Sequence, residues 1–385
     1  MNLSGAAAVR HGVTAVLIGL YAAFVLTAAQ TTHHGVALGG APLFYDFEAF
    51  YEAGRFVLRG DAAGAYNDAR MIAAEHAAFP GMTLKLPWNY PPTLQLLLTP
   101  LAALPYVLAW LVWSVGGYAA FVLTLRPLAG GRVPALLLLA PAAAVNLFFG
   151  QNGLYTVALL AGGVGLLDRR PLTAGVLLGL LACKPQFAVL APLLLMIGGH
   201  WRALAAAAAS QALLAGGALL LLGPDPWVGF IDRMLHPMSV IRSSSSDWRA
   251  VPSLMTFART CGLGPGPAAL AHWTGAAVAA LTALWVWRRS PDPALRAATA
   301  GAATVLISPY LRAYDLALLA PAVGWLWGHA RLSPSRPEKV LQQLIAVLAW
   351  VAPALLMFSS PQIQYGALIS LAVVLALARR LHRSA

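Results

Sequence analysis

The stretch LTAGVLLGLLACKPQFAVLAPLLLMIGG, residues 172–199, decides how the chain is threaded through a membrane. It is apolar almost throughout, and its single charge, Lys184, stands in the middle. Pro185 has no backbone N–H to donate, and proline disfavours helical backbone at the residue before it. We therefore expect two short helices, 172–183 and 186–199, with Lys184 and Pro185 at the turn between them.

The whole chain has the composition of an integral membrane protein. Of its 385 residues, 59% are hydrophobic and only 10% are charged, whereas soluble domains carry about 25% charged residues. A bilayer core takes roughly 20 apolar residues per helix, and we expect about twelve spans. The predicted spans are 12–30, 107–125, 133–149, 153–167, 172–183, 186–199, 203–222, 267–287, 295–309, 314–328, 340–357 and 363–378. The prediction is one all-α polytopic domain over residues 1–385.

The distribution of basic residues orients these spans. With the N-terminus in the cytoplasm, 15 of the 25 Lys and Arg residues but only three of the 13 acidic residues fall on the inner side. Short cytoplasmic loops are enriched in Lys and Arg. Orientation therefore explains the net charge of +12, and no nucleic-acid partner is expected. We predict a multi-pass protein of the cell inner (plasma) membrane with both termini cytoplasmic.

Two longer loops are predicted on the outer side, at 31–105 and 223–266. The apolar segment 90–106, YPPTLQLLLTPLAALPY, is divided by prolines. We expect it to be a juxtamembrane or re-entrant segment, which is tolerated at membrane depth only where protein buries it. The serine run 243–246 in the second loop is either a mobile loop or a lid over a substrate.

The first outer loop opens with LFYDFEAFYEAGRFVLRG, residues 43–60, which we expect to form a juxtamembrane helix. Apolar residues at helical spacing give it one face for packing: Phe47, Phe50, Tyr51 and Gly54. The other charges are expected to lie in water or in surface pairs: Glu48, Glu52, Arg55 and Arg59. Asp46 at its start either caps the helix or carries chemistry.

This threading brings the unusual polar residues to one face of the membrane. They are Asp46, Glu48, Tyr90, Asn146, Gln151, Asn152, Lys184, Ser308, Tyr310, Arg312, Tyr314 and Asp315. Structural interpretations remain open for several of them. Lys184 could extend to the headgroups as an anchor, Arg312 and Asp315 could pair at i, i+3, and Gln151 and Asn152 could satisfy backbone groups at a turn.

Five segments in order also resemble glycosyltransferase family 87. They are DFEAFYEAGRFVLRGDAAGAYN, WNYPPTLQLLLTPLAALPY, FFGQNGLYTVALL, GVLLGLLACKPQFAVLAPLLL and SPYLRAYDLALLAPA, which lie between about residues 43 and 325. The resemblance implies a GT-C fold, an active site on the extracytoplasmic side and a polyprenyl-phosphate sugar donor. Some family members carry a histidine where this chain has YLRAYD after the Ser-Pro turn.

The resemblance implies a hexosyltransferase, mannosyltransferase-like and inverting, that transfers a sugar to a hydroxyl of a glycolipid or glycan acceptor. Asp46 matches the expected catalytic base. Lys184 and Arg312 are expected to bind the donor phosphate, since a charge at membrane depth is expensive without a function. The other substrate-binding candidates are Glu48, Tyr90, Gln151, Asn152, Tyr310, Tyr314 and Asp315. No metal or other cofactor is expected, because the histidines are scattered and there is no Asp-x-Asp motif.

Two other classes of protein remain as alternatives. A transporter or flippase of a lipid-linked or small polar substrate would show repeats, broken helices and ionisable groups near the midplane. Here the charges lie at one face, and the first outer loop is long. A non-catalytic assembly or binding protein is the second alternative, and sugar transfer by the purified protein separates the enzyme from both.

Overall fold

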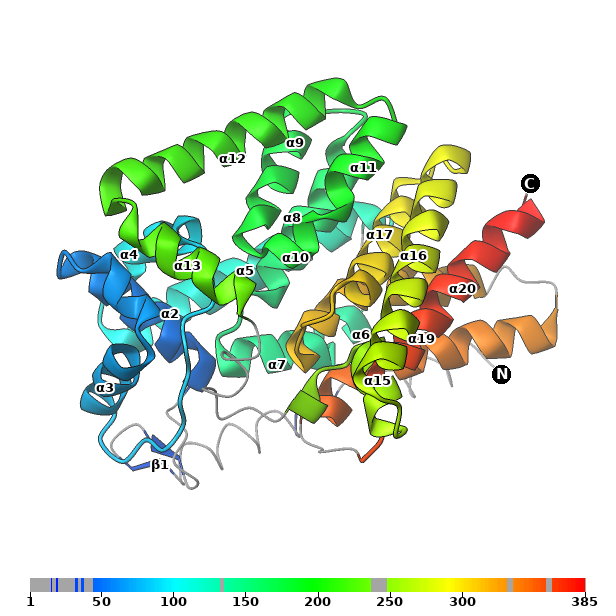
Figure 1. Cartoon of the computed structure of the whole chain (residues 1–385). Coiled ribbons are helices and arrows are strands. Elements are labelled where there is room, and N and C mark those ends of the chain that lie inside the picture. Colours follow the sequence, from blue (N-terminus) through cyan, green and yellow to red (C-terminus); the bar gives the residue numbers. More distant parts are fainter. Residues whose placement is uncertain are drawn as a thin grey trace.

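The protein is built almost entirely of helices, as a computed structural model shows (Figure 1). The structure describes residues 15, 19, 32–33, 36–37, 44–131, 135–236, 248–330, 335–357 and 362–384. Two short strands, β1 Thr32–His33 and β2 Val36–Ala37, pair in antiparallel fashion. The all-α prediction is therefore confirmed for the described residues apart from this small pair.

The first half of the chain supplies helices on both sides of the Lys184 turn. Their bounds are α2 Tyr45–Leu58, η1 Ala62–Tyr66, α3 Asp68–Ala78, α4 Pro92–Ala102, α5 Tyr106–Leu128, α6 Ala135–Leu138, α7 Pro141–Phe149, α8 Gly153–Leu166, α9 Pro171–Leu180, η2 Leu181–Cys183, α10 Pro185–Ala188 and α11 Leu190–Ile197. The elements labelled η are 3-10 helices.

The second half contributes longer helices. Their bounds are α12 Trp201–Leu222, α13 Asp225–Leu235, η3 Trp248–Ala250, α15 Leu254–Thr260, α16 Pro265–Arg289, α17 Pro293–Ile307, η4 Ala313–Leu319, α18 Ala320–Ala330, α19 Arg336–Met357 and α20 Gly366–Ser384. The serine run 243–246 lies outside the described residues.

The chain breaks at Lys184, as the proline after it predicts. Lys184 has non-helical backbone angles (φ −126°, ψ 84°), and Pro185 is the first residue of α10. Figure 1 shows α9 and α11 extending to the same side of α10. Two short helical segments therefore replace the single long helix that an unbroken apolar run would form.

Four helices among the described residues are long and apolar enough to cross a membrane: α5, α12, α16 and α19. Shorter apolar helices cover Gly153–Leu166, Pro171–Cys183, Pro185–Ile197, Pro293–Ile307 and Gly366–Arg379. The protein is thus a membrane protein, while the count of about twelve spans stays a prediction. The first predicted span, 12–30, lies almost wholly outside the described residues.

One predicted span, 133–149, differs from its expected form. The structure divides it into α6 and α7, with extended backbone at Ala140 (φ −58°, ψ 134°). Pro141 is the first residue of α7 and causes this break, because proline disfavours helical backbone at the residue before it.

Small residues allow helices of the bundle to approach closely. Gly175 and Gly179 of α9 face α12, where an added Cβ on Gly175 would lie 2.2 Å from the Ala203 carbonyl oxygen. Helix α17 is buried along nearly its whole length and is rich in alanine. It packs against α8, α16, α18 and α20. Such small-residue contacts drive helix association in lipid, where there is no hydrophobic effect between helices.

The first predicted outer loop forms a second cluster built from α2, η1, α3 and α4. The predicted apolar face of α2 is confirmed, since Phe47 and Phe50 are fully buried. Gly54 lies so close to α4 that a Cβ there would be 2.7 Å from the Ala102 Cβ. The proline-divided segment 90–106 forms α4 and the start of α5, and protein buries much of α4, including Leu98.

Candidate functional site

Helix α2 positions Asp46 through an unusual start. Its N-cap residue is Phe44, in a left-handed conformation (φ 58°), and not Asp46. The Phe44 ring stacks on Trp110 at 3.5 Å between centroids, and its carbonyl oxygen accepts a hydrogen bond from the Tyr106 hydroxyl at 3.2 Å. Aromatic packing therefore fixes the helix start, and the interpretation of Asp46 as the cap is wrong.

The Asp46 carboxylate is held by the turn before α8. Gln151 Nε2 donates a hydrogen bond to Asp46 Oδ2 at 2.7 Å. Gln151 Oε1 in turn accepts hydrogen bonds from the Tyr90 hydroxyl at 3.4 Å and from the Asn152 backbone N–H at 3.3 Å. Because both ends of the Gln151 amide are engaged, its donor is directed at the carboxylate. Gln151 thus does more than satisfy backbone groups at a turn.

The surroundings of Asp46 make its carboxyl a stronger base than an exposed aspartate. Desolvation raises the pKa of Asp46 from 3.8 to about 6, while the Gln151 hydrogen bond and the charges of Arg312 and Lys184 lower it. The side chain nevertheless keeps partial contact with solvent. A carboxylate of this kind is largely ionised at neutral pH and has increased affinity for a proton.

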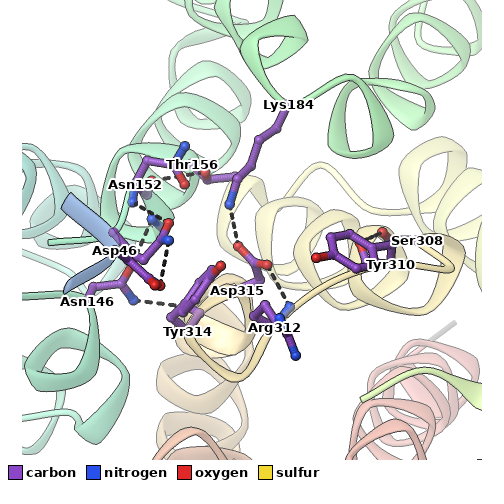
Figure 2. A network of polar contacts seen from close by, with 12 residues as sticks. Asp46, Asn146, Asn152, Thr156, Lys184, Ser308, Tyr310, Arg312, Tyr314 and Asp315 are labelled. Carbon is purple, nitrogen blue, oxygen red and sulfur yellow. Dashed lines mark hydrogen bonds and ion pairs between the residues drawn. The ribbon is translucent and has the colours of Figure 1, made fainter. Parts of the chain in front are cut away.

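Lys184 projects from the helix break into the same cluster (Figure 2). Its Nζ lies 2.6 Å from Asp315 Oδ1, and both side chains are almost fully buried. The interpretation of Lys184 as an anchor reaching the headgroups is therefore wrong. A buried ion pair needs good geometry and further hydrogen bonds to offset desolvation. Asp315 meets this need by accepting a second hydrogen bond, from the Arg312 backbone N–H at 2.8 Å.

Aromatic rings surround the Lys184 ammonium group on several sides. Its Nζ lies 5.2 Å from the ring centroid of Phe187, 5.4 Å from that of Tyr314 and 5.8 Å from that of Tyr90. Ring faces stabilise a cation within about 6 Å. The ammonium group is therefore held in one place by one carboxylate and three rings.

Asn146 joins the segment that precedes α8 to the segment that carries Asp315. Its Nδ2 donates to the Tyr314 carbonyl oxygen at 3.0 Å, and its Oδ1 accepts from the Gly153 N–H at 2.8 Å. The bond to Tyr314 joins two residues that lie 168 positions apart in the sequence. Asn146 was noted in the sequence only for its position, because nothing local identifies such distant partners.

The structure brings most of the predicted site residues together. The cluster contains Asp46, Tyr90, Gln151, Asn152, Lys184, Arg312, Tyr314 and Asp315. Tyr310 lies at its edge, partly exposed, with the Arg312 guanidinium 6.0 Å from its ring centroid. In Figure 2 Tyr310 and Ser308 stand to one side of the Asp46 group.

Glu48 lies outside this cluster, on another face of α2. It was expected to lie in water or in a surface pair, but its side chain is completely buried against Glu75 of α3. Glu52 is also buried, and it pairs with Arg55 at 2.7 Å and with Arg59 at 3.4 Å. The expectation of water around Glu48 and Glu52 is wrong because α3 folds back over this face of α2, whereas the expected pairing of these charges is confirmed for Glu52 with Arg55 and Arg59.

The two facing carboxyls of Glu48 and Glu75 both have raised pKa values. Burial raises the pKa of Glu48 well above its usual 4.5, and the charge of Glu75 adds to this. Burial likewise raises the pKa of Glu75 to about 8, against a hydrogen bond from the Leu86 N–H that lowers it. Two carboxyls this close cannot both ionise easily, so the pair retains a proton at neutral pH.

This pair predicts a pH-dependent stability that the double variant Glu48→Gln/Glu75→Gln removes. The folded state holds a proton that the unfolded chain releases, so stability is fully present below pH 4.5 and is lost as pH rises toward about 8. We expect the parent to melt at a temperature lower by about 2 °C or more at pH 8.5 than at pH 6. Glu48→Gln/Glu75→Gln should flatten this difference, because neither amide side chain can release a proton, while the amide at position 75 keeps an acceptor for the Leu86 N–H.

Thermal unfolding followed by tryptophan fluorescence measures this effect. Asp61→Asn is the matched control, since Asp61 makes a more exposed ion pair with Arg70 and should leave the pH dependence unchanged. Equal pH dependence in the parent and in the double variant would show that these two carboxyls hold no proton in the folded state.

Within the ranges that the structure describes, no group of three or more His, Cys, Asp or Glu side chains could hold a metal ion. The expectation that no metal takes part stays a prediction. The interactions available at the cluster are those of carboxylates, amides, rings and two cations.

A helical bundle that holds a carboxylate of raised pKa next to the buried Lys184 and the partly exposed Arg312 defines an integral membrane protein with a polar site suited to proton transfer and anion binding. The sequence model of glycosyltransferase family 87 matches residues 88–309, more than half of the chain. The chain belongs to this family and is thus a membrane glycosyltransferase. No curated protein and no solved structure matches it.

The family match covers only part of the cluster. Tyr90, Gln151 and Lys184 lie inside the matched residues, whereas Asp46 and Asp315 lie beyond its two ends. The interpretation of Asp46 as a base is therefore supported by the resemblance of the segment that begins at Asp46 and by the geometry of its side chain. The family match does not extend to this residue.

Proposed function

We propose that the protein transfers a hexose, mannose being the expected one, from a polyprenyl-phosphate donor to a hydroxyl group of a glycolipid or glycan acceptor. The reaction takes place at the extracytoplasmic face of the inner membrane, with both termini in the cytoplasm. The observation that carries the proposal is the convergence of Asp46 and the buried Lys184–Asp315 pair in one polar cluster.

Asp46 acts as the general base in this proposal. As the acceptor oxygen attacks the anomeric carbon, its proton passes to the Asp46 carboxylate. The bond between the anomeric carbon and the phosphate oxygen breaks, and polyprenyl phosphate leaves with the electron pair. Attack on the side opposite to the leaving group inverts the anomeric configuration. Gln151 keeps the carboxylate oriented through its 2.7 Å hydrogen bond.

Lys184 and Arg312 bind the donor phosphate in this proposal. A lysine ammonium has three N–H donors, and Asp315 takes one of them. Another is available for a phosphate oxygen, and such charge-assisted bonds stabilise the leaving group as its charge develops. Asp315 orients Lys184 and also holds the Arg312 backbone.

The remaining cluster residues are proposed to contact the sugar and the acceptor. The Tyr90 hydroxyl, the side chains of Asn152 and Tyr314, and Tyr310 at the edge supply donors, acceptors and rings of the kind that sugars bind. Glu48 has no part in substrate binding in this proposal, since its side chain is buried against Glu75, outside the cluster.

The raised pKa of Asp46 predicts the pH profile of transfer. The base must be ionised, so kcat/KM should fall tenfold for each unit below a pH of about 6 and level off above it. The measurement is transfer of labelled hexose from a polyprenyl-phosphate donor in reconstituted vesicles between pH 4.5 and 8. Donor binding measured over the same range separates the base from the phosphate site. A flat profile from pH 5 to pH 8 would contradict the assignment of Asp46.

A further inference from the structure

Helix α13, Asp225–Leu235, follows the predicted membrane span α12 after a short turn at Gly223 and Pro224. Figure 1 shows α13 turning back from the end of α12 toward the helices of the first predicted outer loop, α2 to α4. The last turn of α12 exposes leucines, with Leu220 at 87% exposed. Helix α13 therefore starts where a row of exposed leucines on a predicted membrane span ends.

One face of α13 is apolar and uncovered. Val228, Ile231 and Leu235 are 65%, 53% and 71% exposed, and Met234 beside them is also exposed. Successive residues advance by about 100° around a helix, so these side chains share roughly a third of its circumference. Asp225 and Asp232 are exposed along one edge of this apolar face.

The opposite face of α13 packs against η1 and α4 of the first predicted outer loop. Arg233 is almost fully buried, and its guanidinium donates to the Tyr66 carbonyl oxygen at 2.7 Å and to Asn89 Oδ1 at 3.2 Å. It also makes an ion pair with Asp68. Gly229 lies against Tyr66, where an added Cβ would be 2.7 Å from the tyrosine Cβ. Protein contacts thus fix which face of α13 points away from the molecule.

We infer that α13 is an interfacial helix whose face of Val228, Ile231, Met234 and Leu235 inserts into the bilayer surface at the C-terminal end of α12. Its occupant is lipid, because the apolar face continues the exposed leucines at the end of the predicted span α12. Helices with one apolar and one polar face lie in the interface with the apolar face at the headgroup and acyl-chain boundary.

A short series of hydrogen bonds connects α13 to the candidate site. Arg233 holds Tyr66, and the Tyr66 hydroxyl donates to the Tyr90 carbonyl oxygen at 2.8 Å. The Tyr90 hydroxyl in turn donates to Gln151, which holds Asp46. The helix therefore sets the depth of the first outer segment relative to the lipid.

The test places an environment-sensitive fluorophore on single cysteines in the full-length protein lacking Cys183 and Cys261. Labels at Val228, Ile231 and Leu235 are compared with labels at Asp225 and Asp232. The protein is reconstituted in phosphatidylethanolamine–phosphatidylglycerol vesicles with lipids that carry a quencher near the headgroup end of the acyl chain. Each labelled protein must keep the thermal unfolding temperature of the unlabelled protein, so that the readout reports the native helix.

The lipid quencher should lower emission about twofold or more at Val228, Ile231 and Leu235, and by less than about a tenth at Asp225 and Asp232. Iodide in the buffer should give the reverse pattern. Labels at the three apolar positions that iodide quenches and lipid does not would place this face in water and overturn the inference. Protection of those three labels from both quenchers would show that another protein surface covers them, which also overturns it. Neither readout depends on sugar transfer.

Discussion

Asp46→Asn should lower the rate of sugar transfer by about 10²–10⁴-fold, the range that general-base catalysis contributes. The amide has nearly the shape of the carboxylate but cannot take up the acceptor's proton. Its Oδ1 can still accept the Gln151 hydrogen bond, and the helix start does not depend on residue 46, because Phe44 is the N-cap. Thermal stability and donor affinity should therefore stay near those of the parent.

Glu48→Gln is the matched control for Asp46→Asn. Glu48 lies two residues further along the same helix but is buried against Glu75, so this variant should keep substantial transfer activity. An Asp46→Asn enzyme that transfers at the parent rate would rule out a base at this position. Equal losses in the two variants would instead assign the effect to the structure of α2.

Lys184→Ala should weaken donor binding by about 10- to 100-fold, the loss expected when one charge-assisted hydrogen bond is removed. It should also slow transfer, since the departing phosphate loses a cation that stabilises its charge. Binding of a polyprenyl-phosphate sugar to the purified protein and the rate of transfer measure the two effects separately.

Lys184→Ala also removes the ion-pair partner of Asp315, and a second substitution at Asp315 supplies the control. Removing the lysine leaves Asp315 buried without its ion-pair partner, which is destabilising by about 3–5 kcal/mol. In the double variant Lys184→Ala/Asp315→Asn no buried charge is left over, so thermal stability should recover while donor binding stays weak. Parent-like affinity in the double variant would show that Lys184 serves only to neutralise Asp315.

Local features of the fold were predictable from the sequence. The break at Lys184 follows from Pro185, and the packing of Phe47 and Phe50 follows from their helical spacing. Both depend on residues within a few positions of one another, where backbone sterics and periodicity decide the outcome. Even so, the break in front of Pro141 was missed, because the apolar run 133–149 looked long enough for one span.

Partners that are distant in the sequence were not predictable. Asp315 lies 131 residues from Lys184, and the sequence offered Arg312 as its nearest cation. The pairing of Glu48 with Glu75 was missed for another reason: solvated charges are the usual outcome for glutamates on a helix, and only the fold of α3 over α2 reverses it. The contacts of Arg233 depended likewise on the approach of the two predicted outer loops to each other.

The most direct test of the central claim follows the label of a polyprenyl-phosphate hexose in vesicles that contain only the purified protein and an acceptor. We predict that the label becomes linked to an acceptor hydroxyl with release of an equal amount of polyprenyl phosphate, and that Asp46→Asn stops both. A transporter or flippase would give another result, in which the intact donor reaches the opposite leaflet and no label joins the acceptor. That result would contradict the assignment of this site to glycosyl transfer.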